Sequence, residues 1–363
     1  MHMSDALLAP AVAATMYVMS TSTAGVSVIK LRAEERSSDG PASVKLPTMA
    51  VMSALVFAGQ MVNYTIPGTG SSGHLCGSML LTSLLGPWAG FLSMIAVLLI
   101  QCLFFADGGI LALGANVWNM AFYGCFVGYF LIYRPILRSR LFAKKGVNTS
   151  NRIKLVLAAV LGCIAALQLG AFSVVIETSL SGITELPFGA FAGMMQPIHL
   201  AIGLVEGLIT SAVLLFVYEA RPELLQDLKE GEQVENKVSY KATISILAIV
   251  TVVVGGGLSL AASTDPDGLE WALFGNTEGG YSQNMGLDEE TYSVHDELHD
   301  RAAAVRENTA FMPDYSFADE EENPAGTGVA GLVGSVMVAV LAVAICLAGG
   351  FLRRGGHHKK KPQ

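Results

Sequence analysis

Long apolar runs separated by short polar connections dominate the chain. About 20 consecutive apolar residues are needed for a helix to cross a bilayer, and the candidate segments on that rule are 6–29, 46–62, 76–86, 88–105, 115–133, 153–176, 197–218, 241–262 and 328–352. The segment 76–86 is short and ends at Gly86-Pro87. Since lipid cannot satisfy bare backbone, we expect it to be a half-span packed inside the protein or one arm of a bent hairpin.

Basic residues alternate with these segments in a regular way. Of the 22 Lys and Arg, 20 fall in four stretches, 30–45, 134–154, 219–241 and 353–361. The connections 63–75, 106–114 and 177–196 contain none. All four basic stretches lie on one side if every segment crosses, including 76–86, and the positive-inside rule makes that side cytoplasmic. We therefore expect the C-terminus in the cytoplasm and the N-terminus outside.

These patterns predict an all-α integral membrane protein. Residues 1–220 would form a compact seven-helix transmembrane bundle, 221–240 a cytoplasmic linker, and 241–363 two further transmembrane helices flanking an extracytoplasmic acidic segment, 263–325. The first residues, Met-His-Met-Ser-Asp, contain no basic n-region, so we expect no cleaved signal peptide. Cleavage near Ala24 is the alternative, and it would remove the candidate site described below.

Composition narrows the possible classes of protein. Hydrophobic residues make up 52% of the chain and charged residues only 14%, against about 25% charged in soluble domains. Disorder and a small disulfide scaffold are excluded, and a net charge of −8 argues against a nucleic-acid partner. The segment 263–325 has a net charge of −14: it is a solvated face or, alternatively, an electrostatic funnel for cations. The cysteines lie singly in apolar segments and read as small core residues.

The strongest candidate chemistry lies at the N-terminus. A chain that starts X-His offers one ion its terminal amine, the deprotonated amide of residue 2 and the imidazole of His2. These three nitrogens can lie in one plane, which suits Ni(II) or Cu(II) rather than Zn(II). His74, in the small-residue loop that starts at Gly68, is expected on the same face and is a candidate fourth ligand. A structural role is the alternative for either histidine taken alone.

Other polar residues in the apolar segments are weaker candidates. His199 reads as a structural residue near the start of its span or, alternatively, as a group that orients a metal ligand. Gln101 and Glu206 are polar groups within spans, which are costly and therefore often functional. Asp107, Asn116 and Asn119 could hydrogen-bond the loop of His74 or orient its imidazole.

Several motifs together resemble the NikM/CbiM family, the substrate-specific components of energy-coupling-factor (ECF) nickel and cobalt transporters. They are Met1-His2, Ser-Gly-His-Leu at 72–75, Leu-Leu-Gly-Pro-Trp-Ala at 84–89, Asp-Gly-Gly-Ile-Leu-Ala-Leu-Gly-Ala-Asn at 107–116 and His-Leu-Ala-Ile-Gly-Leu-Val-Glu-Gly at 199–207. Asp-Pro-Asp-Gly-Leu-Glu at 265–270 resembles the small NikN/CbiN component, so the chain looks like a fusion of the two. The resemblance implies a metal site made by Met1, His2 and His74. The loop before His74 departs from the family pattern by holding extra small residues.

The resemblance implies capture of Ni(II), or of Co(II) for cobalamin biosynthesis, for ATP-driven import. No GxxxxGK[ST] sequence occurs, so the ATPase would be a separate cytoplasmic partner, joined by a transmembrane coupling component in the lipid bilayer. We expect no tightly bound cofactor and no enzymatic activity. The alternatives from other classes are an intramembrane metal-dependent enzyme, which would need an open coordination position, and a sensor or permease that works without ATP.

Overall fold

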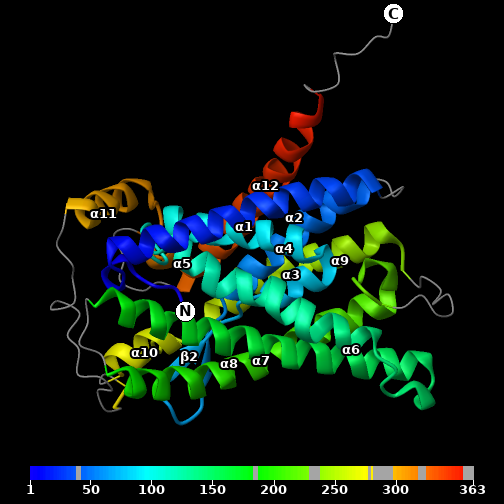
Figure 1. Ribbon diagram of the computed structural model, residues 1–363, viewed down its shortest axis with the longest axis horizontal. Coiled ribbons are helices and arrows are strands. Elements are labelled where there is room, and N and C mark those ends of the chain that lie inside the picture. Colours follow the sequence, from blue (N-terminus) through cyan, green and yellow to red (C-terminus); the bar gives the residue numbers. More distant parts are fainter. Residues whose placement is uncertain are drawn as a thin grey trace, which may run out of the picture.

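The computed structural model describes residues 1–37, 42–182, 187–228, 238–276, 279–280, 297–317 and 324–354. Long helices run side by side along the molecule (Figure 1). In chain order the helices are α1 (Pro10–Ser37), α2 (Ala42–Gln60), α3 (Ser78–Leu85), α4 (Pro87–Phe104), α5 (Leu113–Val117), η2 (Trp118–Tyr133), α6 (Arg134–Arg138), α7 (Val147–Ser181), α8 (Phe188–Ala220), α9 (Tyr240–Gly256), α10 (Gly268–Phe274), α11 (Glu297–Thr309) and α12 (Pro324–Arg354). One small hairpin pairs β1 (Tyr64–Ile66) with β2 (Ser71–Gly73).

Seven helical stretches in the described residues are long and apolar enough to cross a membrane, and α2 adds a shorter one, Leu46–Gln60. The protein is therefore an all-α, multi-pass membrane protein, as the apolar pattern predicts. The doubtful segment 76–86 becomes α3, whose residues Ser78–Leu84 are buried. It meets α4 at Gly86, whose φ of 84° turns the chain. The segment is thus one arm of a bent hairpin, shielded by protein because it is too short to face lipid.

The two C-terminal helices pack on the body of the molecule. Helix α12 lies against α2 and α9 (Figure 1). At the crossing of α9 and α12, a Cβ built on Gly331 would lie 2.2 Å from the carbonyl oxygen of Gly255. On the side facing α2, a Cβ on Gly334 would lie 2.1 Å from the ring of Phe57. Glycines at these points allow the close backbone approach that drives helix association in lipid.

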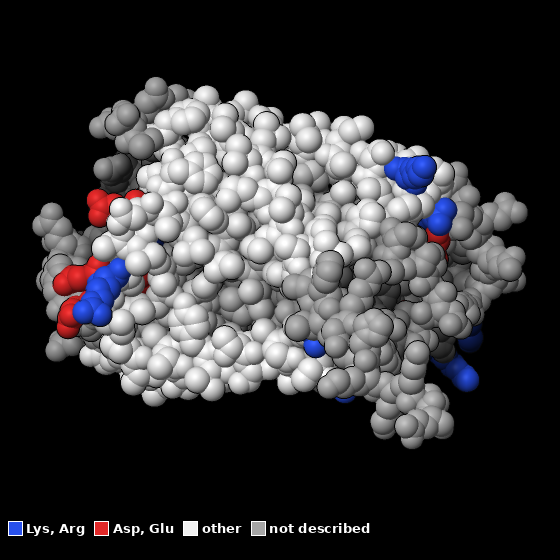
Figure 2. Space-filling model, turned by 90° about the horizontal axis from the view of Figure 1, so that it is seen from above, with Lys and Arg blue, Asp and Glu red and all other residues white. Residues whose placement is uncertain are grey.

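Charge and apolar surface are segregated along the molecule. Most of the visible Lys and Arg lie at one end. Most of the visible acidic side chains lie at the end that holds α10 and α11, together with a basic side chain, and the face between the ends is nearly free of coloured side chains (Figure 2). Exposed apolar residues such as Leu131, Ile249 and Val336 belong to the long helices. Such a surface suits a bilayer. Many of the acids in 263–325 fall on 281–296 and 318–323, outside the described residues.

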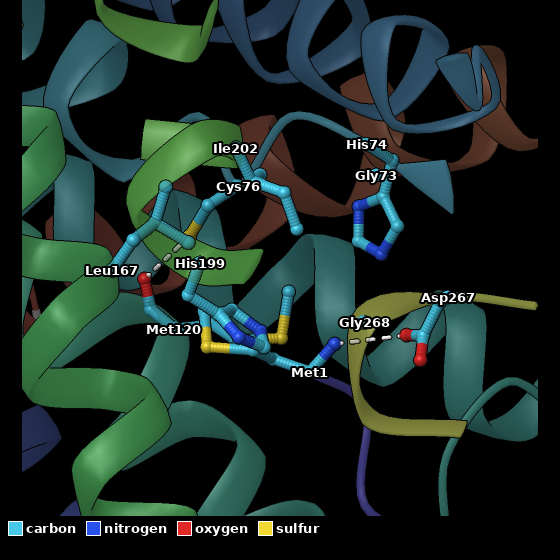
Figure 3. Close-up of a pocket in the computed structure, with 10 residues that line it drawn as sticks. All are labelled: Met1, Gly73, His74, Cys76, Met120, Leu167, His199, Ile202, Asp267 and Gly268. Carbon is cyan, nitrogen blue, oxygen red and sulfur yellow. Dashed lines mark hydrogen bonds and ion pairs between the residues drawn. The ribbon is translucent and has the colours of Figure 1, made fainter. Parts of the chain in front are cut away.

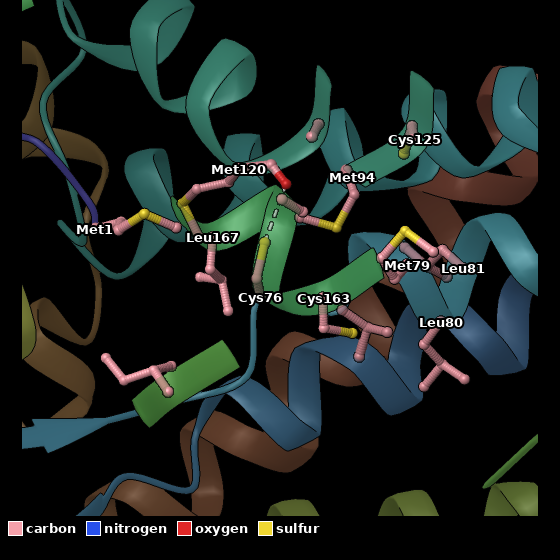
Figure 4. Close-up of a cluster of buried hydrophobic side chains, with 14 of the residues drawn as sticks. Met1, Cys76, Met79, Leu80, Leu81, Met94, Met120, Cys125, Cys163 and Leu167 are labelled. Atoms are coloured by element: carbon pink, nitrogen blue, oxygen red, sulfur yellow. Dashed lines mark hydrogen bonds between the residues drawn. The ribbon is translucent and has the colours of Figure 1, made fainter. Parts of the chain in front are cut away.

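A core rich in sulfur fills the space between the helices (Figure 4). Cys76, Cys102, Cys125 and Cys163 are buried and free, in accord with their prediction as small core residues. The side chain of Cys346 lies outside the described residues. Met1 belongs to the same core and is only 5% exposed, so the N-terminus lies inside the molecule.

Candidate metal centre

The first residues of the chain lie inside the acidic end of the bundle, where hydrogen bonds between backbone and side-chain groups hold them. Met3 N–H donates to Asn116 Oδ1 (2.8 Å), and Met3 carbonyl oxygen accepts from Gly109 N–H (2.9 Å). The carboxylate of Asp5 accepts from the backbone of Ile110 (3.2 Å) and Ala112 (3.0 Å). A Cβ on Gly109 would lie 1.8 Å from Asp5 Oδ1. This docking places Met1 and His2 in the interior.

His74 follows the β1–β2 hairpin and is anchored from both sides. Gly73 passes so close to α8 that a Cβ there would lie 2.6 Å from Ile202 Cγ1. Beyond His74, the backbone N–H groups of Cys76 and Gly77 donate to the two oxygens of Glu206, at 2.8 and 3.0 Å. The polar residue within α8 therefore has a structural task, because it clamps the chain that carries His74.

The ring of His74 is set for metal binding through one nitrogen. Its Nδ1 lies 3.0 Å from the carbonyl oxygen of Leu75, which can only accept, so Nδ1 carries the hydrogen. Nε2 is then left with a lone pair. Burial lowers the pKa of His74 to about 4, and the nearby amine of Met1 and the ring of His2 act in the same direction. The imidazole is therefore neutral at neutral pH, as a metal ligand must be.

Two hydrogen-bonded side-chain amides, those of Gln60 and Gln101 (the amide relay), determine which nitrogen of the His2 ring carries its hydrogen. Cys76 carbonyl oxygen accepts from Gln60 Nε2 (2.7 Å), and Gln60 Oε1 accepts from Gln101 Nε2 (2.8 Å). Gln101 Oε1 is thus the atom that faces His2 Nε2, at 3.2 Å, and this nitrogen must donate. Nδ1, the nitrogen that can close a six-membered chelate with the amide of His2, faces Asp107 Oδ1 at 3.3 Å.

The three predicted site residues lie together. The rings of His2 and His74 stack, with centroids 5.4 Å apart. The amine of Met1 points to Asp267 Oδ2, 2.9 Å away, and His74 lies beside the same space (Figure 3). In the described residues no three His, Cys, Asp or Glu side chains form a metal-binding group.

A cavity of about 10 Å³ lies beside these groups, lined by Met1, His74, His199 and Asp267 among others (Figure 3). That is room for about one water molecule or ion. A larger cavity, about 570 Å³, reaches His2 from the acidic end. Its lining includes Asp5, Asp107, Asp267, Glu270, Asp300 and Asp314. A cation approaching the inner groups would pass these carboxylates.

Family comparison bears on both parts of the chain. Residues 2–224 match the model of the cobalt uptake substrate-specific transmembrane region, CbiM, and residues 241–349 match the PDGLE domain. The chain belongs to the CbiM family. Its C-terminal part carries the fused PDGLE domain, so the resemblance to a NikM/CbiM protein joined to a NikN-like component is confirmed.

Relatives with the same fusion match over nearly the full length. A putative fused nickel transport protein NikMN of Archaeoglobus fulgidus is 34% identical over 95% of this chain and 98% of its own. A probable fused nickel transport protein LarMN of Lactiplantibacillus plantarum is 29% identical over 99% of this chain and 98% of its own.

Other similar proteins match only part of the chain. The cobalt transport protein CbiM of Sorangium cellulosum is 33% identical over 50% of this chain and 77% of its own. The crystal structure of a truncated transition metal transporter is 32% identical, covers 60% of this chain and 99% of its own, and has a TM-score of 0.49.

Within this CbiM-family fold, some polar residues have roles that differ from the predicted ones. Asn116 holds the backbone of Met3 rather than the loop of His74. Asp107 lies at the ring of His2, and Asn119 donates to Glu177 (2.8 Å). His199 is not near the start of its helix, because α8 begins at Phe188 and continues through Pro197.

Three residues at the site escaped sequence reasoning: Asp5, Gln60 and Asp267. Gln60 ends an apolar run. A polar group in a membrane span is costly and therefore often functional, and this cost is the one feature of the sequence that points to Gln60. Asp5 carries no signal in the sequence beyond its place near the start of the chain. Asp267 belongs to the motif that marks the PDGLE domain, but nothing in the sequence pattern relates it to Met1. Their contacts join segments that are remote in sequence.

Proposed function

We propose that this chain captures Ni(II), or else Co(II), and hands it on for import across the membrane. The observation that supports the proposal best is the convergence of the terminal amine, His2 and His74 at one buried point. The match to the CbiM family and the names of its relatives, both nickel and cobalt transport proteins, support the same class of cargo. Co(II) uptake is the second candidate because of the family model and the cobalt relatives.

The proposed ligands are the amine of Met1, the deprotonated amide and Nδ1 of His2, and Nε2 of His74. Four nitrogens of this kind favour a tetragonal or square-planar ion, which is the reason for preferring Ni(II). The amide relay supports this set, because it keeps the hydrogen of His2 on Nε2. Asp107 remains beside the ring as a compensating negative charge. A planar set of four ligands leaves little room for an activated water, which favours transport over hydrolysis.

The larger cavity, whose lining holds six carboxylates and Arg306, is the proposed route for the ion. A cleft lined mainly by one sign of charge raises the local concentration of the opposite ion. We infer that this end of the molecule faces outside and that the basic end faces the cytoplasm. The energy would come from a separate ATPase through a transmembrane coupling protein, as in ECF transporters.

Substitution of the two imidazoles tests the proposed site. In the purified full chain, His2→Ala and His74→Ala should each abolish high-affinity Ni(II) binding measured by calorimetry. His358→Ala is the matched control, because this histidine belongs to the basic C-terminal stretch of the sequence and is not a proposed ligand. Unchanged Ni(II) affinity in both site variants would sink the proposal. Uptake in cells with and without the partner ATPase tests the energy source separately.

A further inference from the structure

The C-terminal domain reaches the metal centre through one carboxylate. Asp267 Oδ2 accepts from the terminal amine of Met1 at 2.9 Å, across 266 residues of sequence. The side chains at the two ends of this contact are 3% and 22% exposed. The carboxylate and the terminal ammonium therefore form a largely buried ion pair.

The segment that carries Asp267 is also fastened to the hairpin that carries His74. Ser72 N–H donates to Pro266 carbonyl oxygen (2.8 Å), and Ser72 Oγ donates to Asp265 carbonyl oxygen (2.7 Å). Farther along, Trp271 Nε1 donates to Thr69 carbonyl oxygen (2.9 Å). These bonds lock the C-terminal segment to the loop directly before His74, so one rigid unit holds both Asp267 and His74.

The two oxygens of Asp267 have separate tasks. Oδ1 caps α10 by accepting from the N–H groups of Leu269 (2.8 Å) and Glu270 (2.9 Å). This N-cap fixes the rotation of the carboxylate. Oδ2 is thereby directed at Met1, and its position does not depend on the amine. An ordinary surface ion pair lacks such a fixed acceptor.

We propose that Asp267 is a positioning residue of the metal site, contributed by the C-terminal domain. An ammonium pairs with it when no metal is present. A metal-bound amine keeps two N–H groups, so one can still donate to Oδ2 while the lone pair points to the ion. The charge balance favours the same role, because a divalent ion with a single amidate ligand keeps one positive charge. This inference rests on the proposed function.

The test compares Asp267→Asn with Asp265→Asn in the full chain. Asparagine keeps the capping oxygen at position 267 but places an NH₂ group where Oδ2 faces the amine. Groups that orient metal ligands typically contribute 10–100-fold in affinity, so we expect Asp267→Asn to weaken Ni(II) binding by roughly that factor. Asp265 is the matched control, since its carboxylate contacts Thr65 and Asn276 rather than Met1. Thermal melting in detergent checks that both variants fold.

A second measurement separates an effect on the amine from a merely structural one. A chain extended by one residue before Met1 no longer presents its amine at this place. In that background Asp267→Asn should cause no further loss of the residual Ni(II) affinity. Equal affinity of Asp267→Asn and wild type, or an equal loss in the extended chain, would overturn the inference. Either result leaves the proposed function standing if His2→Ala and His74→Ala have lost Ni(II) binding, whereas unchanged binding in both of these variants refutes the site itself.

Discussion

Replacing Gln101 by methionine isolates the amide relay behind His2. Methionine has nearly the same length and volume, so the core stays filled. The change removes the oxygen that accepts from His2 Nε2 at 3.2 Å and the NH₂ that donates to Gln60 at 2.8 Å. Gln101 is 1% exposed, so water cannot replace either bond.

The expected size of the effect follows from the charge on the ring. A neutral buried hydrogen bond contributes about 1 kcal/mol, and one to a charged group about 1.5–3 kcal/mol. A metal on Nδ1 makes the Nε2–H donor more positive, so the loaded form loses more than the empty form. The difference, about 0.5–2 kcal/mol, corresponds to roughly a 2- to 30-fold weaker metal affinity.

Isothermal calorimetry of the purified full chain with Ni(II) measures this difference, and thermal melting reports the cost to folding. Gln60→Met is the matched control, because it breaks the relay one step farther away and leaves the contact between Gln101 and His2 in place. Its effect on affinity should be the smaller of the two. The reasoning fails if Gln101→Met binds Ni(II) as tightly as wild type, or if Gln60→Met weakens binding to the same extent.

Two further predictions concern the docked N-terminus and pH. Gly109→Ala should displace the first residues, because its Cβ would lie 1.8 Å from Asp5 Oδ1, and should abolish Ni(II) binding in calorimetry, whereas Gly189→Ala, with nothing within 4 Å, should bind normally. Burial lowers the pKa of His74 in the folded protein to about 4, from an ordinary value of 6.5. Between these two pH values the unfolded chain binds more protons than the folded protein, so the free energy of unfolding is highest above pH 6.5 and falls as the pH falls toward 4. The melting temperature of the metal-free protein should drop across this window, and less so in His74→Gln. An equal pH dependence in that variant would contradict the assignment.

The chemistry of the site was predictable where it depends on local covalent structure. The chelating power of Met1-His2 follows from the number of bonds between an amine, an amide and an imidazole, whatever the fold. The helices were predictable for a related reason, because a span must be long and apolar to satisfy its backbone in lipid. The short segment 76–86 was readable only as two alternatives, since its shielding depends on neighbours.

The partners of those ligands were decided by tertiary structure alone. Gln60 and Gln101 lie on different helices, and their amides form a relay only because α2 and α4 place them side by side. Asp267 contacts Met1 across 266 residues. Asn116 holds Met3 instead of the His74 loop. Periodicity and composition describe which residues avoid water, but directional hydrogen bonds depend on distances of about 3 Å between remote segments, and those distances exist only after the helices have packed.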